Sequence, residues 1–121
     1  MKVLVVDDSS TMRRILQNCL SEAGYKDVVQ ASDGIEALDV LAKDKSVNLM
    51  LVDWHMPNMD GFTLLQEVKG RPEYKDIKII MVTTQAEKQS VVEALQAGAS
   101  SYVVKPFTPE VIKEKIAEVI K

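Results

Sequence analysis

Short apolar runs alternate with longer segments of helical period along the whole chain. In the longer segments, apolar residues recur every three or four positions, which is the pattern of an amphipathic helix. The run KIIMV at 78–82 is apolar after its lysine, which indicates a strand buried on both faces. We therefore predict five strands, at 2–6, 27–31, 49–53, 78–82 and 101–104, with a helix after each.

Turn-forming residues mark the ends of these helices. Gly24, Gly70 and Gly98 follow apolar periodic segments, as helix-ending glycines do, and Pro109 suits the first turn of the last helix. Ser9 or Ser10 can cap the first helix. The apolar positions that define the helices run over 12–23, 35–41, 62–68, 91–95 and 109–119.

The alternation predicts an α/β fold, in which a doubly wound parallel sheet has right-handed crossovers and helices on both faces. Such sheets bind ligands at the carboxyl ends of their strands. Four of the predicted strands end in polar residues, so these side chains should lie close together at one edge of the sheet. These residues are Asp7 and Asp8, then Asp53, then Thr83 and Thr84, and finally Lys105.

Composition narrows the class of protein. The 121 residues are 46% hydrophobic and 27% charged, which suits one globular domain spanning 1–121. A net charge of -3 without a basic cluster gives no support to nucleic-acid or membrane partners. Cys19 is the single cysteine, so an internal disulfide is excluded. With no membrane-length apolar run and no signal-like leader, we expect a cytoplasmic protein.

Each polar strand end has an ordinary explanation by itself. Asp7 and Asp8 could cap a helix, and Lys105 could be a surface lysine. Together at one edge they favour a site, because three converging carboxylates repel one another unless a cation neutralises them. Oxygen ligands suit Mg²⁺, whereas one histidine and one cysteine make no zinc site.

Asp53 then becomes a candidate nucleophile. It ends the apolar run LMLVD, where a buried strand has no structural use for a charge. A metal beside this carboxylate would screen an incoming phosphoryl group. Thr83 and Lys105 could meet the negative charge that phosphorylation of Asp53 adds.

The stretches VLVVDDSS, LVDWHMPNMDG, MVTT and AGASSYVVKPF occur in the order found in response-regulator receiver domains, which the chain resembles over its whole length. The resemblance implies a flavodoxin-like (βα)5 fold with strand order 2-1-3-4-5. It also implies that Asp53 is the phosphoacceptor and that Asp7, Asp8 and the backbone carbonyl of His55 bind Mg²⁺ with it.

The same resemblance assigns roles to residues of the last two strands. Lys105 would contact a phosphoryl oxygen, and the peptide between it and Pro106 is expected to be cis. Thr83 would be the switch hydroxyl and Tyr102 the switch aromatic residue.

Within the family, DSSTMRRI, the DW pair and AGASSYVVKPFTPEVIKEK are most similar to single-domain chemotaxis regulators. This implies a monomeric phosphoacceptor rather than an enzyme, with self-catalysed phosphotransfer from a histidine kinase and self-catalysed hydrolysis. No output domain is expected after the last helix, so the signal would be a surface that a flagellar motor switch protein binds. Its expected residues are Ala86, Val91, Leu95, Tyr102, Val104 and Lys115, although helical period alone also allows Val91 and Leu95 to be buried.

Two positions depart from the chemotaxis pattern. His55 and Gln85 stand where those regulators have asparagine and glutamate. The resemblance implies that these side chains tune how fast water attacks the phosphoryl group. The alternative for His55 is a solvent-facing side chain without such a role.

Other functions remain open at this point. A phosphorelay intermediate that passes phosphate to a histidine phosphotransfer protein would have the same motifs. An aspartate-nucleophile phosphatase normally has a second aspartate where His55 stands, and a flavodoxin needs a phosphate loop that Asp7 and Asp8 would repel. The sequence gives neither the cognate kinase, the phosphate lifetime nor the direction of a motor response, and it leaves open whether a dedicated phosphatase acts.

Overall fold

The computed structural model describes residues 1–84 and 88–120. Strands and helices alternate as predicted, and the differences at the strand ends are one or two residues. The strands are β1 (Lys2–Val6), β2 (Val28–Ala31), β3 (Val47–Asp53), β4 (Lys78–Thr83) and β5 (Ser101–Val104). The helices are α1 (Ser10–Glu22), α2 (Gly34–Lys43), α3 (Gly61–Lys69), α4 (Lys88–Gln96) and α5 (Pro109–Val119), with a short 3-10 helix at Pro72–Tyr74.

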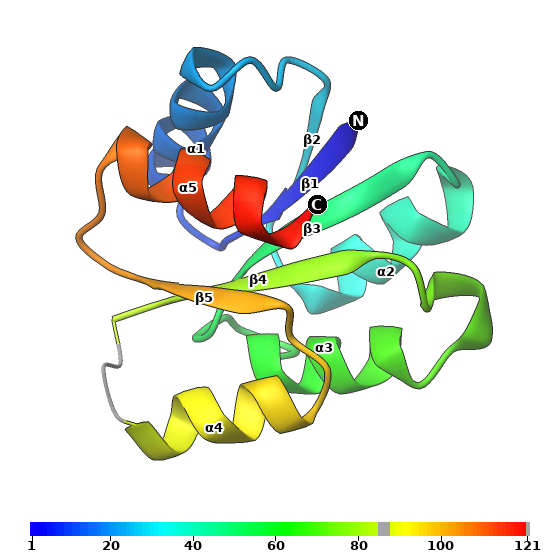
Figure 1. Cartoon of the computed structure of the whole chain (residues 1–121). Coiled ribbons are helices and arrows are strands. Elements are labelled where there is room, and N and C mark those ends of the chain that lie inside the picture. The colour runs from blue at the N-terminus through cyan, green and yellow to red at the C-terminus, as the bar shows by residue number, and fades with distance from the viewer. Residues whose placement is uncertain (85–87, 121) are drawn as a thin grey trace.

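The five strands form one parallel sheet in the order β2-β1-β3-β4-β5, which confirms the flavodoxin-like topology. Helices α1 and α5 cover one face, and α2, α3 and α4 cover the other (Figure 1). The chain runs outward from β1 to β2 and then returns to β3 on the other side of β1. Crossovers therefore leave the carboxyl ends of β1 and β3 in opposite directions, which opens the sheet edge between them to a ligand.

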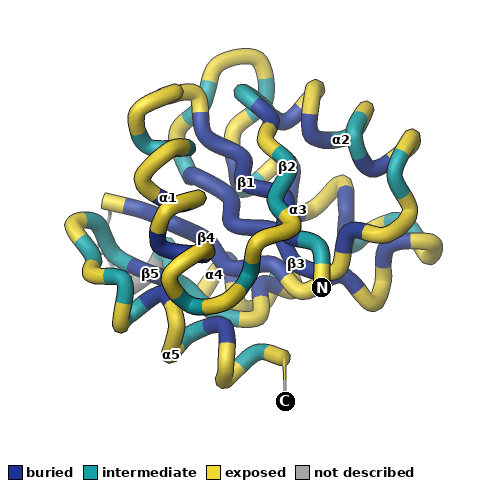
Figure 2. Tube along the Cα trace, turned by 90° about the horizontal axis from the view of Figure 1, so that it is seen from above, coloured by how far each residue is buried: buried dark blue, intermediate teal, exposed yellow. Residues whose placement is uncertain are grey.

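Burial on both faces explains the continuous apolar strands. In β1, Val3 and Val5 pack with α1 and α5, whereas Leu4 and Val6 pack with α2 and α3, and all four are 0% exposed. Figure 2 shows the central strands as buried, with buried and exposed positions alternating along the helices. Each such side chain contributes about 1.5–3 kcal/mol by leaving water.

The residues that cap the helices are polar, but they are not the predicted site residues. The Ser9 hydroxyl accepts a hydrogen bond from the Met12 amide and so caps α1, as one of the two predicted caps. Asp33, Asp60 and Thr108 cap α2, α3 and α5 in the same way. Capping therefore does not explain why Asp7, Asp8 and Asp53 are carboxylates.

Gly61 allows α3 to start directly beneath the end of β3. A Cβ atom at this position would lie 2.2 Å from the backbone carbonyl oxygen of Asp53. The Gly61 amide also donates a hydrogen bond of 2.8 Å to the Trp54 carbonyl. This close approach fixes the backbone that carries Asp53.

We predict that Gly61→Ala lowers the free energy of unfolding by about 2 kcal/mol or more, because the added methyl group forces β3 and α3 apart. Gly70→Ala is the control, since its Cβ would lie 3.1 Å from its nearest neighbour, the Gln66 carbonyl oxygen, and should cost less. Urea unfolding measures both variants. Equal stabilities would show that the contact between Gly61 and Asp53 is not restrictive.

Candidate functional site

Three carboxylates meet where β1 and β3 end. Asp7 follows β1, Asp8 comes next, and Asp53 is the last residue of β3. One oxygen from each lies within 4.8 Å of the other two. Asp7 is 1% exposed and Asp53 8% exposed, whereas Asp8 faces solvent. The structure therefore brings together the three acidic residues that the sequence predicted as metal ligands.

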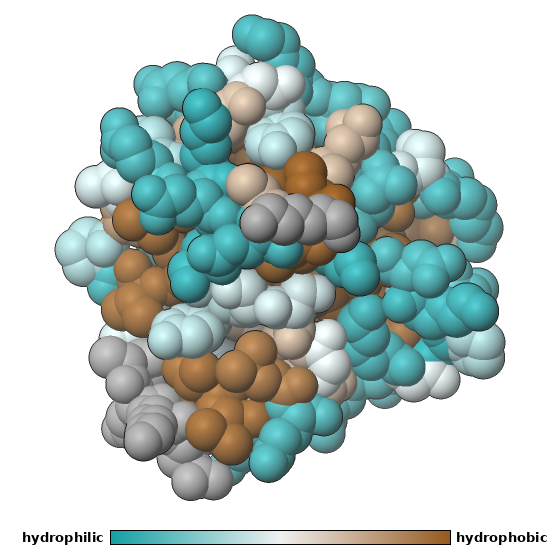
Figure 3. Space-filling model, in the orientation of Figure 1, coloured by the Kyte–Doolittle hydropathy of each residue, from teal (hydrophilic) through white to brown (hydrophobic). Residues whose placement is uncertain are grey.

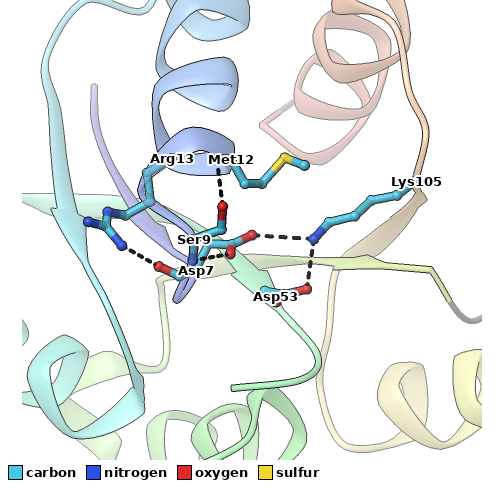
Figure 4. Close-up of polar contacts among 6 residues, drawn as sticks. All are labelled: Asp7, Ser9, Met12, Arg13, Asp53 and Lys105. Carbon is cyan, nitrogen blue, oxygen red and sulfur yellow. Dashed lines mark hydrogen bonds and ion pairs between the residues drawn. The ribbon is translucent and has the colours of Figure 1, made fainter. Parts of the chain in front are cut away.

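Lys105 lies between two of these carboxylates. Its Nζ atom is 3.1 Å from Asp53 Oδ1 and 3.3 Å from Asp7 Oδ2 (Figure 4). The Lys105 side chain is 15% exposed, so it is not an ordinary surface lysine. Its amide donates to the Thr83 carbonyl at 2.7 Å, and the Lys105–Pro106 peptide is cis, as predicted. The loop after β5 thus aims one positive charge at the acidic cluster.

The loop between β1 and α1 is held by hydrogen bonds that the sequence pattern did not indicate. The Ser9 amide donates to Asp7 Oδ1 at 2.9 Å, and Arg13 Nη1 donates to the Asp7 carbonyl oxygen at 2.7 Å (Figure 4). Arg13 Nε donates in turn to Gln30 Oε1 in β2. These contacts orient Asp7 before any ligand binds.

Burial raises the pKa of the Asp53 carboxyl, and the charges of Asp7 and Asp8 raise it further. The hydrogen bond and charge of Lys105 act in the opposite direction. One ammonium group therefore does not balance three carboxylates. A divalent cation fits this donor set, because hard oxygen ligands that leave room for water are the ones Mg²⁺ prefers.

The predicted switch residues lie on the neighbouring strands. Thr83 ends β4, is 2% exposed and pairs with Val104 of β5, while Tyr102 is partly buried. The side chain of His55 is exposed. Gln85, the second predicted rate-tuning residue, and Ala86, a predicted contact residue, lie outside the described residues.

The predicted partner face is apolar over α4. Leu95 is 43% exposed, which rules out burial against the sheet, while the neighbouring Ala94 is 1% exposed and packs inward. Val92, which was not predicted, is 37% exposed. Figure 3 shows an apolar patch in this region. The remaining predicted residues are partly buried: Val91, Tyr102, Val104 and Lys115, whose Nζ atom lies 5.5 Å from the Tyr102 ring centroid.

Comparison with known proteins decides the family. The model of the response regulator receiver domain matches residues 3–117. The chain belongs to this family. A chemotaxis protein CheY homolog of Campylobacter jejuni is 51% identical over 120 residues, which are 99% of this chain and 92% of the relative.

Solved structures agree. Vibrio cholerae chemotaxis protein CheY4 has a TM-score of 0.90 and 36% identity, covering 98% of each chain. A CheY from Borrelia burgdorferi, solved in a CheX-CheY-BeF3-Mg²⁺ complex, has a TM-score of 0.89 and 26% identity, covering all of this chain and 90% of that one. The protein is therefore a CheY-like response regulator receiver domain. Among its described residues, no helix is long and apolar enough to cross a membrane.

Trp54 provides a probe of the acidic cluster. Its amide donates to the Val82 carbonyl, and its ring stacks on Phe62 with centroids 5.6 Å apart. We predict that Mg²⁺ changes Trp54 fluorescence and saturates in the millimolar range, because the ion stays largely hydrated. At ten times the dissociation constant, Mg²⁺ should add about 1.4 kcal/mol to the free energy of unfolding.

Asp8→Ala should abolish both effects of Mg²⁺. Asp76→Ala is the matched control, because Asp76 is exposed and precedes β4, at the opposite edge of the sheet. Fluorescence titration and thermal melting supply the measurements. Identical responses from Asp8→Ala and the wild type would show that the acidic cluster is not the metal site.

Proposed function

We propose that this receiver domain is a phosphorylation switch of chemotaxis. A histidine kinase would phosphorylate Asp53 with the help of Mg²⁺, and the phosphorylated protein would bind a flagellar motor switch protein. The observation that carries the proposal is the buried Asp53 carboxylate, with two further carboxylates within 4.8 Å and the Lys105 ammonium at 3.1 Å. The residues proposed as nucleophile, as cation ligands and as counter-charge therefore lie close together.

The carboxylates of Asp7, Asp8 and Asp53, with the backbone carbonyl of His55, would hold Mg²⁺. The ion supplies positive charge that screens the carboxylate from the phosphoryl oxygens. The Borrelia burgdorferi complex, whose CheY is similar in structure to this chain, contains Mg²⁺ and BeF3, which supports Mg²⁺ as the ion. Asp7 is already oriented by the Ser9 amide, so little reorganisation is needed for binding.

Asp53 would act as the nucleophile. Its carboxylate oxygen forms the new bond to phosphorus while the P–N bond of the donor phosphohistidine breaks, and the bonding electrons stay with the imidazole. Lys105 would shift its hydrogen bond from Asp53 to a phosphoryl oxygen, where a charge-assisted contact is strong. Water later hydrolyses the acyl phosphate. Because the chain itself contains these groups, both steps would be self-catalysed.

The output would pass through Thr83 and Tyr102 to α4, β5 and α5. The Thr83 hydroxyl would turn toward the phosphoryl group, and Tyr102 would move with it. The exposed Val92 and Leu95 supply apolar contact area on this face. We propose a motor switch protein as the partner, rather than a phosphotransfer protein, because of the 51% identity to a chemotaxis regulator.

The remaining parts of the proposal concern the whole protein. We propose that residues 1–121 act as a single receiver domain, as a monomer, in the cytoplasm. The single cysteine, Cys19, is buried and suits a reducing compartment. Nucleic acids and membranes are not expected as partners.

Acetyl phosphate plus Mg²⁺ should phosphorylate Asp53, because among the described residues the three-carboxylate cluster lies here. Intact-mass and peptide mass spectrometry should show one phosphoryl group, on the peptide that contains Asp53. Asp53→Asn should remain unmodified, and omitting Mg²⁺ should stop the reaction. Equal labelling of Asp53→Asn and the wild type would refute the mechanism.

Lys105→Ala should leave the fold intact but uncouple phosphorylation from partner binding, since it removes the charge that draws the phosphoryl group into place. Affinity for a purified motor switch protein can be measured with and without beryllofluoride, which stands in for the phosphoryl group. The wild type and the control Lys26→Ala, an exposed lysine before β2, should bind more tightly with beryllofluoride. If beryllofluoride also increased the affinity of Lys105→Ala for the motor switch protein, this result would count against the role of Lys105.

His55→Asn should change the rate of phosphoryl hydrolysis severalfold if the side chain overhangs the phosphoryl group. The decay of labelled protein after removal of acetyl phosphate measures this rate. A rate equal to that of the wild type would leave His55 as a solvent-facing residue.

A further inference from the structure

Residues 54–60 form the loop that joins Asp53 to α3. A hydrogen bond links this loop to the residue that caps α2. Asn58 Nδ2 donates a hydrogen bond of 2.8 Å to Asp33 Oδ2, across 25 positions of sequence. Asn58 has a φ of 66°, in the left-handed region that few side chains adopt readily. We call this contact the Asp33–Asn58 clamp.

The carboxylate of Asp33 is itself held in one orientation. Its other carboxylate oxygen, Oδ1, accepts a hydrogen bond of 2.8 Å from the Glu36 amide and caps α2. Both oxygens accept hydrogen bonds, and these bonds lower the pKa of the Asp33 carboxyl. The charged acceptor for Asn58 is therefore present at neutral pH and does not rotate freely.

A packing contact lies directly beside the clamp. A Cβ atom at Gly34 would lie 2.8 Å from the Cγ and Sδ atoms of Met59, so α2 and the loop approach closely. Met59 in turn packs against the buried cluster beneath α2 and α3. The loop is therefore held by one hydrogen bond and one close contact at adjacent residues.

One end of the loop is tied to the sheet, because the Trp54 amide donates a hydrogen bond to the Val82 carbonyl of β4. The two ends of the loop are also joined to each other, because the Gly61 amide donates to the Trp54 carbonyl. Between these ties and the clamp lies His55. Met56, the residue after His55, packs against the same buried cluster as Met59. The clamp adds a hydrogen bond from outside the loop, three residues after His55.

We propose that Asp33 and Asn58 are positioning residues for the divalent cation. They act through the loop, by holding the His55 carbonyl toward the carboxylates, and do not touch the ion. The inference rests on the proposed function, because it needs the acidic cluster to bind Mg²⁺. It extends the site to α2, which contributes none of the predicted ligands.

The first variant, Asn58→Asp, places two carboxylates against each other and opens the clamp. An added negative charge near the cluster would by itself strengthen Mg²⁺ binding, so a loss of affinity points to the loop. We expect the dissociation constant for Mg²⁺, measured by calorimetry, to rise about tenfold, as for other residues that orient metal ligands. Asn58→Gly tolerates the positive φ without the donor and should also weaken binding.

The rescue variant is Asp33→Asn combined with Asn58→Asp. It keeps the net charge and reverses the hydrogen bond, because the new amide on α2 donates to the new carboxylate in the loop, while asparagine still caps α2. We expect its Mg²⁺ affinity to return close to that of the wild type. Without Mg²⁺, the Gly61 amide should exchange its hydrogen faster in Asn58→Asp than in the wild type or the rescue variant.

The outcomes distinguish a failure of the proposed function from a failure of the Asp33–Asn58 clamp. If wild-type protein does not bind Mg²⁺, the proposed function fails. If the wild type binds and both Asn58 variants bind equally well while melting cooperatively, the clamp does not position the site. Weaker binding in Asn58→Asp that the double variant does not restore would also overturn the role of the pair.

Discussion

Repulsion among three carboxylates is the constraint on which the rest of the site depends. Asp7, Asp8 and Asp53 present oxygens within 4.8 Å of one another, and two of these side chains are buried. Lys105 compensates part of that charge, and burial still raises the pKa of Asp53. The remaining negative potential favours a divalent cation. In the function that we propose, this cation would allow a phosphoryl group to bind beside the carboxylates.

The fold makes this arrangement possible. Adjacent parallel strands β1 and β3 end side by side, and the crossovers leave in opposite directions, so two carboxylates can converge without a helix between them. Gly61 lets α3 start against the Asp53 carbonyl, and the cap at Ser9 leaves Asp7 for another role. The stability of the buried sheet compensates for a cluster of carboxylates whose mutual repulsion does not favour folding.

The strand-end residues could be predicted from the sequence, because the period of the apolar residues and the ends of the apolar runs are local properties of the chain. The places of Asp7, Asp53 and Lys105 follow from where apolar runs stop, and the strand order followed from family resemblance. The contacts of Arg13 and Asn58 were not predicted. Arg13 also bonds to Gln30 of β2, and Asn58 bonds to Asp33, so each has a partner distant in sequence that the folded chain brings near. Helical period likewise left the exposure of Leu95 open, since the boundary of a half-buried helix face depends on how the helix is rotated.

A crystal structure of the protein with Mn²⁺ and beryllofluoride tests the central claim most directly, since Mn²⁺ accepts the same octahedral oxygen ligands as Mg²⁺ and scatters anomalously. The account predicts one anomalous peak about 2 Å from oxygens of Asp7, Asp8 and Asp53 and from the His55 carbonyl, with beryllofluoride on Asp53 and Lys105 Nζ beside a fluorine. Beryllofluoride absent from Asp53, or an anomalous peak away from the three carboxylates at millimolar Mn²⁺, would contradict it.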